Sequence, residues 1–145
     1  MTGLRRIDRL TESHVRDLHA MYLTEWWTHR RVLDDVRRMA RHGVIIGFEE
    51  EATGRLAGFA RVITDFVFKA LVLDVIVQPE HRGTGLGKAL MDAVVEHPDL
   101  KDVLHFELYC RPELVPFYQR WGFTAELGDL TFMRRGAAPP PPPGA

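Results

Sequence analysis

A stretch of alternating glycines between two basic residues stands out in the second half of the sequence. Its members are Arg82, Gly83, Thr84, Gly85, Leu86, Gly87 and Lys88. Glycine lets a ligand approach the main chain closely, and the apolar residues that follow recur at helical spacing, so a helix begins within the loop. Free N–H groups at the start of a helix bind anions, because these groups and the helix dipole both face the ligand. With the flanking arginine and lysine, the stretch predicts a phosphate site.

Two common phosphate loops can be compared with this stretch by spacing. A P-loop needs four residues between its first glycine and the Gly-Lys pair, followed by Ser or Thr. Here only three residues separate Gly83 from Gly87, and Ala89 follows Lys88. A dinucleotide-binding fingerprint would need glycine at position 88. The spacing therefore disfavours both a P-loop nucleotide hydrolase and a dinucleotide site. A magnesium-dependent nucleotide-binding signal would restore the first of these hypotheses.

The spacing that does fit is R-x-x-G-x-G, met by Arg82, Gly85 and Gly87. It resembles the coenzyme A pyrophosphate loop of the GNAT superfamily of N-acetyltransferases. The stretch 114–123, L-V-P-F-Y-Q-R-W-G-F, is similar to the second acetyl-CoA motif of that superfamily, most closely to the version in serotonin (arylalkylamine) N-acetyltransferases. The resemblance covers about residues 70–125 well, and the N-terminal half only in its pattern of elements.

The resemblance implies roles for particular residues around an acetyl-CoA co-substrate. The glycine loop would hold the pyrophosphate, and the strand residues Val75, Ile76 and Val77 would hold the pantetheine, with main-chain bonds from the first and the last. The N–H of Val75 would stabilise the oxyanion. Tyr118 would hydrogen-bond or protonate the departing thiolate; a packing role for this tyrosine is the alternative that the surrounding motif outweighs.

The general base is the part of the chemistry for which the sequence offers least. The serotonin enzymes have two histidines on the strand before the loop, and the matching positions here are Leu71 and Leu73. Asp74 is the only ionisable residue in 70–77. A carboxylate in an apolar strand should have a raised pKa, which suits a base or an ammonium anchor. The alternative is a structural aspartate bound to main-chain amides or to an arginine. Glu107 is a weaker candidate, and ordered water could also serve.

Several other residues have side chains that can take part in chemistry or in packing. Trp26, Trp27 and His29 fall where the family places one wall of the acceptor pocket, so the tryptophans are expected to bind substrate; core or edge packing is the alternative. Cys110 has no motif around it and is interpreted as a small buried hydrophobe. Many members of the family carry an asparagine that contacts the cofactor at the position of Arg111. The arginine here removes that contact or replaces it with a charge near a phosphate. The remaining histidines lack metal-ligand spacing, so we expect no metal.

Composition limits the class of protein. The chain has 145 residues, 46% hydrophobic and 27% charged, as is usual for one globular domain with a real core. A net charge of −1 gives no reason to expect nucleic acid or an acidic membrane as partner. The single cysteine allows no internal disulfide, and neither a membrane-spanning run nor a signal peptide is evident. We therefore expect a cytoplasmic protein.

The order of expected elements predicts an α/β fold, or α+β in its mixed sheet: a central mixed β-sheet flanked by helices, which is the GNAT arrangement. Helices are expected to follow Thr11, to begin near Arg31, to begin within the glycine loop and to begin near Pro116. Strands are expected over 4–10, 44–48, 55–63, 68–77 and 103–110, with a last hairpin over 123–126 and 130–134. The domain would span 1–136, followed by a Pro-rich disordered or polyproline tail over 137–145.

Taken together, these observations predict an N-acetyltransferase that moves an acetyl group from acetyl-CoA to a small primary amine by direct transfer in a ternary complex. The alternative is a non-catalytic acetyl-CoA or CoA-binding sensor or interaction module of the same fold. The missing strand histidines and the Pro-rich tail support the alternative, and the presence of Tyr118 opposes it. Dimerisation is common in the family, so a homodimer is possible.

Overall fold

The computed structural model describes residues 2–136. Within them, the residues up to Tyr109 form one compact unit and those from Cys110 onward form a second. The Pro-rich tail predicted for 137–145 lies outside the described residues.

The first unit is built on a five-stranded sheet in the order β1-β2-β3-β4-β5. The first four strands are antiparallel, and β5 pairs with β4 in parallel, as expected for a strand that returns through a crossover helix. The predicted mixed sheet is therefore confirmed. The strands are β1 (Leu4–Ile7), β2 (Val44–Glu50), β3 (Leu56–Thr64), β4 (Lys69–Val77) and β5 (His105–Glu107).

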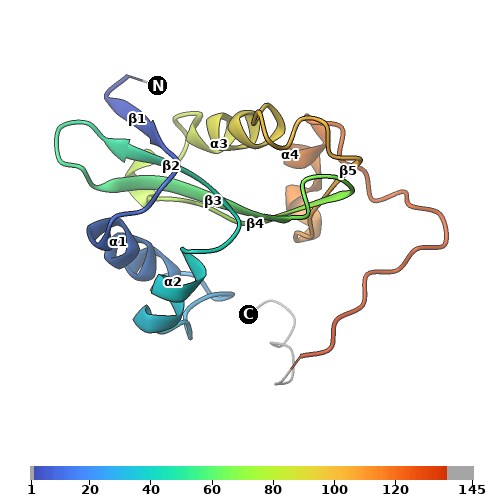
Figure 1. Ribbon diagram of the computed structural model, residues 1–145, viewed down its shortest axis with the longest axis horizontal. Helices are drawn as coiled ribbons and strands as arrows, with labels where there is room; N and C mark the ends of the chain where they lie inside the picture. Colours follow the sequence, from blue (N-terminus) through green and yellow to red (C-terminus); the bar gives the residue numbers. More distant parts are fainter. Residues whose placement is uncertain (1, 137–145) are drawn as a thin grey trace. The chain divides into compact units, whose positions relative to one another are not determined.

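Helices cover both faces of this sheet (Figure 1). On one face, α1 (Glu12–Leu23) and α2 (Leu33–Met39) share a core with buried strand residues that include Phe59 and Ile76. On the other face lies α3 (Leu86–Val95), whose leucines pack directly on Gly58 of β3. No helix within residues 2–136 combines the length and the apolar character needed to cross a membrane.

The start of α1 shows how the sequence fixes a boundary. The Thr11 hydroxyl accepts a hydrogen bond from the backbone N–H of His14, and the Nδ1 atom of His14 accepts one from the backbone N–H of Thr11. This reciprocal capping satisfies two N–H groups that the helix itself leaves unpaired. The cap predicted at Thr11 is confirmed, and it fixes the helix that carries Tyr22 toward the sheet.

The second unit contains a 3-10 turn, Pro112–Leu114, and the short helix α4 (Val115–Gln119), with Pro116 in its first turn as predicted. The predicted hairpin over 123–126 and 130–134 is wrong, because no strand is present between residues 123 and 136. Leu130, Phe132 and Met133 are exposed by 78%, 63% and 86%. An alternating apolar pattern forms a strand only where a neighbouring strand accepts its hydrogen bonds.

Candidate active site

The centre of β4 carries a β-bulge. On one side of it Phe59 pairs with Ile76, and on the other side Arg61 pairs with Leu73, so the β4 strand has one extra residue at this point. Asp74 takes up the irregularity with a φ of +57°, a conformation that non-glycine residues rarely adopt and that Asp tolerates better than most. The bulge therefore lies directly before Val75, the residue whose N–H the resemblance assigns to the oxyanion.

Beyond its first residues, β4 has an unpaired edge. Its ladder with β5 covers only Lys69 to Leu71, opposite His105 to Glu107. Among the described residues, no other strand pairs with this edge from position 72 to position 77. A strand edge with free N–H and C=O groups can take an extended ligand as an added strand. The expected pantetheine residues Val75, Ile76 and Val77 lie on this segment.

The glycine loop leads from that strand into α3. A 3-10 turn over Pro79–His81 ends β4, as the proline predicted. Gly83 and Gly85 have φ values of +75° and +89°, and Gly85 is the N-cap of α3 without any side-chain cap. A Cβ atom at either position would meet no protein atom within 4 Å, so these glycines are required by their backbone conformation and not by crowding. The N–H groups of the first turn of α3 are thus left without a side-chain acceptor, which suits an anion.

The two cations that flank the loop have partners within the protein. Arg82 donates through Nη2 to Glu25 at 3.0 Å and through Nε to the Val77 carbonyl at 3.3 Å. Lys88 donates to Asp92 at 2.7 Å, one turn along α3. Both side chains are more than half exposed, so these ion pairs are weak and either cation can turn toward a phosphate.

Asp74 is buried and held by three side chains. Tyr22 donates its hydroxyl to Oδ2 at 2.9 Å, Arg31 donates to Oδ2 at 2.6 Å and to Oδ1 at 3.3 Å, and the Nε of Arg61 donates to Oδ2 at 2.7 Å. Burial by itself raises the pKa of Asp74, but the hydrogen bonds and charges of Arg31 and Arg61 outweigh it, and the pKa lies below its usual range. The predicted rise of this pKa is therefore wrong. The geometry favours the structural alternative, an aspartate bound to arginines, over a base.

The same cluster borders a pocket on the α2 side of the sheet. The pocket has a volume of about 280 Å³ and is lined by Arg31, Asp35, Val36, Met39 and Arg61. Sequence reasoning missed both arginines as site residues. One signal was present: Arg61 and Asp74 are each the only charged residue of an apolar run, 56–63 and 70–77, on strands expected to be neighbours.

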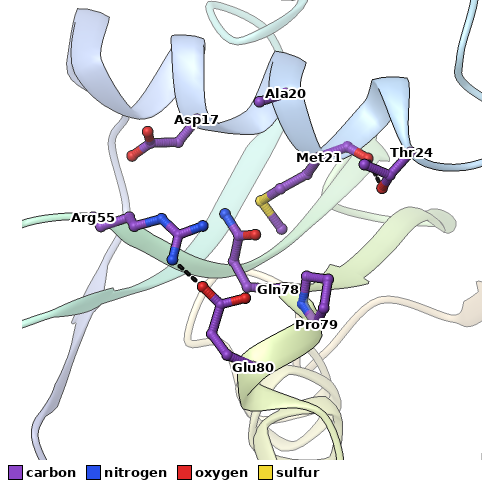
Figure 2. A pocket seen from close by; sticks show the side chains of 8 residues that line it. All are labelled: Asp17, Ala20, Met21, Thr24, Arg55, Gln78, Pro79 and Glu80. Atoms are coloured by element: carbon purple, nitrogen blue, oxygen red, sulfur yellow. Dashed lines mark hydrogen bonds and ion pairs between the residues drawn. The ribbon is translucent and has the colours of Figure 1, made fainter.

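A second pocket, of about 260 Å³, lies between α1 and the turn that follows β4 (Figure 2). Its polar side chains are already bonded: Arg55 pairs with Glu80, Gln78 donates to the Leu56 carbonyl, and Asp17 accepts from the Leu56 N–H. These bonds fix the turn that leads into the glycine loop. We interpret the residues that line this pocket as structural supports of that turn, since none of the predicted site residues is among them.

The two tryptophans expected to bind the acceptor lie in the segment between α1 and α2. Trp26 and Trp27 are each 39% exposed, and neither lines one of the two pockets. The Trp26 carbonyl is 2.7 Å from Nδ1 of His29. Further along the same segment, Arg31 donates to Asp74. The two tryptophans therefore come shortly before Arg31 in the sequence. Their role in substrate binding stays a prediction.

Tyr118 lies in the second unit, on α4. Its ring packs edge-on against Phe117 and Phe123, with centroids 4.9 Å and 6.2 Å away. Burial, with a smaller contribution from Cys110, raises the pKa of Tyr118 to about 12. Burial also raises the pKa of the Cys110 thiol, which opposes a thiolate nucleophile there. Tyr118 is thus a protonated hydrogen-bond donor at neutral pH, and its part in the reaction remains a prediction.

The two remaining ionisable candidates have ion-pair partners. Glu107, the weaker candidate for the base, lies 3.2 Å from Lys69 at the exposed end of the β4–β5 pair. Arg111, at the position where the resemblance led us to look for asparagine, lies 3.3 Å from Glu113. Within residues 2–136, no group of three or more His, Cys, Asp and Glu side chains is arranged to hold a metal ion.

Comparison with known proteins agrees with this geometry. The family model described as "Acetyltransferase (GNAT) domain" matches residues 19–137. The chain therefore belongs to the GNAT acetyltransferase family, which confirms the resemblance stated from the loop and the tyrosine motif.

Curated relatives are named N-acetyltransferases. The chain is 38% identical over 100 residues to the chloroplastic serotonin N-acetyltransferase 2 of Oryza sativa subsp. japonica, covering 67% of this chain and 50% of that protein. It is 34% identical over 94 residues to the chloroplastic GCN5-related N-acetyltransferase 1 of Arabidopsis thaliana, covering 63% of this chain and 48% of that protein. The chain thus spans about half the length of these relatives.

Among solved structures, a GNAT-family protein from Xanthomonas campestris pv. campestris superposes with a TM-score of 0.82 at 34% identity, covering 94% of both chains. The predicted fold class is thereby confirmed.

Proposed function

We propose that this protein is an acetyl-CoA-dependent N-acetyltransferase that transfers the acetyl group directly to a primary amine in a ternary complex. One observation carries the proposal: the unpaired edge of β4 continues from the bulge at Asp74 into an uncapped, glycine-rich N-terminus of α3. An extended ligand with a phosphate end fits such an arrangement, because strand edge and helix terminus offer main-chain groups in sequence.

The glycine loop supplies the anion site in this proposal. The N–H groups between Arg82 and Lys88 bind the pyrophosphate, and the two exposed flanking cations exchange their carboxylate partners for it. Val75 and Val77 bind the pantetheine through their main-chain groups, so their side chains are free to be apolar. The family's requirement for acetyl-CoA agrees with this set of donors.

The chemistry then proceeds at the bulge. The amine nitrogen attacks the thioester carbon, the carbonyl electrons move to oxygen, and the Val75 N–H donates to that oxyanion, an interaction worth roughly 3 kcal/mol. The C–S bond breaks when the carbonyl re-forms, the sulfur leaves as a thiolate, and the nitrogen, positively charged after the attack, gives its proton to ordered water. Because the pKa of Tyr118 is about 12 and that of a thiol about 8.5, the hydroxyl stabilises the thiolate mainly by hydrogen bonding.

The acceptor must lose a proton before it attacks. Asp74 is engaged by two arginines with a lowered pKa, and Glu107 pairs with Lys69. We therefore assign the proton transfer to ordered water and give Asp74 the role of holding Arg31 and Arg61 in place.

Thiol release from acetyl-CoA across a panel of amines tests the proposal. Wild-type protein should release thiol with one class of amine, and Tyr118→Phe should lower kcat by about tenfold or more, because the variant loses the hydrogen bond to the departing thiolate and a hydrogen bond to a charged group contributes about 1.5–3 kcal/mol. Tyr109→Phe, the same change at a half-exposed tyrosine of the first unit, is the matched control and should keep the rate.

Binding measurements separate this function from the non-catalytic alternative. Acetyl-CoA should raise the melting temperature of wild type and of Tyr118→Phe alike. No thiol release with any amine, together with a preserved thermal shift, would favour the CoA-binding module. The loss of both signals would remove the assignment of the glycine loop.

A further inference from the structure

The pocket beside Asp74 has a charge pattern that the reaction itself does not require. It is lined by two arginines, one aspartate and two apolar side chains, and both arginines donate to Asp74, the strand residue that precedes Val75. Its volume of about 280 Å³ is at the small end of ligand pockets, which run from roughly 300 to 1,000 Å³. A small molecule fits this space better than a large one.

The two guanidinium groups are fixed in position and only partly neutralised. Arg31 and Arg61 both donate to the Oδ2 atom of Asp74, and their side chains are 31% and 16% exposed. Two positive charges against one negative charge leave the cluster with one net positive charge. Because the arginines are already ordered by Asp74, little side-chain entropy is lost when they bind a further group.

Arg61 has donors left for a ligand. A guanidinium carries five N–H donors in a planar fork that matches a carboxylate. Arg61 uses its Nε for Asp74, and among the described residues its terminal nitrogens have no hydrogen-bond acceptor. An anionic oxygen group that entered the pocket would therefore meet a preorganised donor pair.

We propose that this pocket binds the carboxylate of the acceptor, so that the substrate is an amine that also carries a carboxylate, such as an amino acid. This inference rests on the proposed acetyl transfer and names its substrate class. One net positive charge balances a carboxylate and falls short of the charge of a phosphate, about −1.5 to −2. Asp35 opposes an anion only weakly, because its side chain is 69% exposed at the rim and is screened by water and salt.

Pairs of acceptors that differ only in the carboxylate test the proposal with the wild-type protein. Phenylalanine would be compared with phenethylamine, lysine with cadaverine, and β-alanine with ethylamine and with phosphoethanolamine. A charge-assisted pair is expected to raise kcat/KM by about tenfold or more for the carboxylate member of the preferred pair. Equal rates, or a preference for the decarboxylated or the phosphorylated member, would overturn the proposal.

Two variants with the same change in net charge locate the effect. Arg61→Gln removes the fork in the pocket and should bring the members of the preferred pair to within about threefold of each other. Arg41→Gln, at an exposed arginine outside the pocket, should keep the preference. If Arg61→Gln fails to fold by circular dichroism, Arg61→Lys keeps the charge, loses the planar fork and should show the same loss of preference.

The readouts separate this inference from the proposed function. Thiol release that does not distinguish carboxylated from decarboxylated amines would leave the acetyltransferase in place and remove the substrate class. Absence of thiol release with every amine would remove the proposed function, and with it this inference. An unchanged carboxylate preference in a folded Arg61→Gln would place the recognition elsewhere and overturn the assignment of this pocket.

Discussion

The Nε of Arg61 on β3 donates to Oδ2 of Asp74 on β4 at 2.7 Å, across the β-bulge that separates the two paired segments of these strands. Arg31, in the loop before α2, donates to the same oxygen atom, so Asp74 also connects the sheet to that loop. It also lies directly before Val75, so a structural ion pair and the proposed oxyanion donor are neighbours on one strand.

Replacing Asp74 with asparagine should destabilise the protein. Asn keeps the shape and tolerates the left-handed φ of +57°, so the change isolates the charge. Two arginines then lose their buried counter-ion, and the free energy of unfolding should fall by about 3 kcal/mol at neutral pH, measured by urea denaturation.

The pH dependence of that loss has a definite sign. The pKa of Asp74 lies lower in the folded protein than in the unfolded chain, where it is about 3.9, so its stabilisation is complete above that value and is lost as the pH falls through the folded pKa. The stabilities of wild type and Asp74→Asn should therefore begin to converge below about pH 4 and become equal only below the folded pKa. A difference that stays constant down to acid pH would contradict the ion-pair assignment.

The same variant separates a structural role from a catalytic one. If Asp74 positions arginines and takes no proton, Asp74→Asn should lower kcat/KM without moving the midpoints of its pH profile. The measurement is the initial rate of thiol release across about pH 6 to 9, with saturating acetyl-CoA. Loss of the acidic limb in Asp74→Asn would restore the aspartate as the general base.

The sequence was sufficient to predict the glycine loop and the cap at Thr11, because both depend on interactions a few residues apart along the chain. The partners of Asp74, by contrast, are distant in sequence and could not be predicted from local patterns. Arg31 is 43 residues away, and it reaches the carboxylate only because α1 and α2 pack on that face of the sheet. The sign of the pKa shift depended on these partners, and a prediction from the apolar strand alone gave burial too much weight.

The length of β5 could not be predicted from the local sequence pattern either. The run 103–110 was expected to form one strand, yet only His105–Glu107 pair with β4. The number of bonded residues depends on how far two strands stay adjacent, which is a property of the sheet. This shortening leaves open the β4 edge on which the proposed function depends.

Gly58 tests how closely α3 must approach the sheet. A Cβ atom there would lie 3.0 Å from Cδ2 of Leu86 and 3.3 Å from Cδ1 of Leu90, and both leucines are fully buried. Gly58→Ala should therefore lower the free energy of unfolding by about 1 to 3 kcal/mol. Leu86→Val in the same chain makes room, so the double variant should lose less than the sum of the single changes; strict additivity would show that the contact is unimportant.

Gly85→Ala tests whether the loop serves the cofactor or only the fold, and the chain offers a matched control in Gly54→Ala. Both glycines have positive φ, +89° and +74°, and a Cβ atom at either position meets nothing within 4 Å. Each variant should lose about 1 kcal/mol of stability from backbone strain alone. Because Gly85 caps α3 at the proposed pyrophosphate site, only its variant should also bind acetyl-CoA at least tenfold more weakly by calorimetry. Equal affinities in the two variants would mean that the N-terminus of α3 does not hold the phosphates.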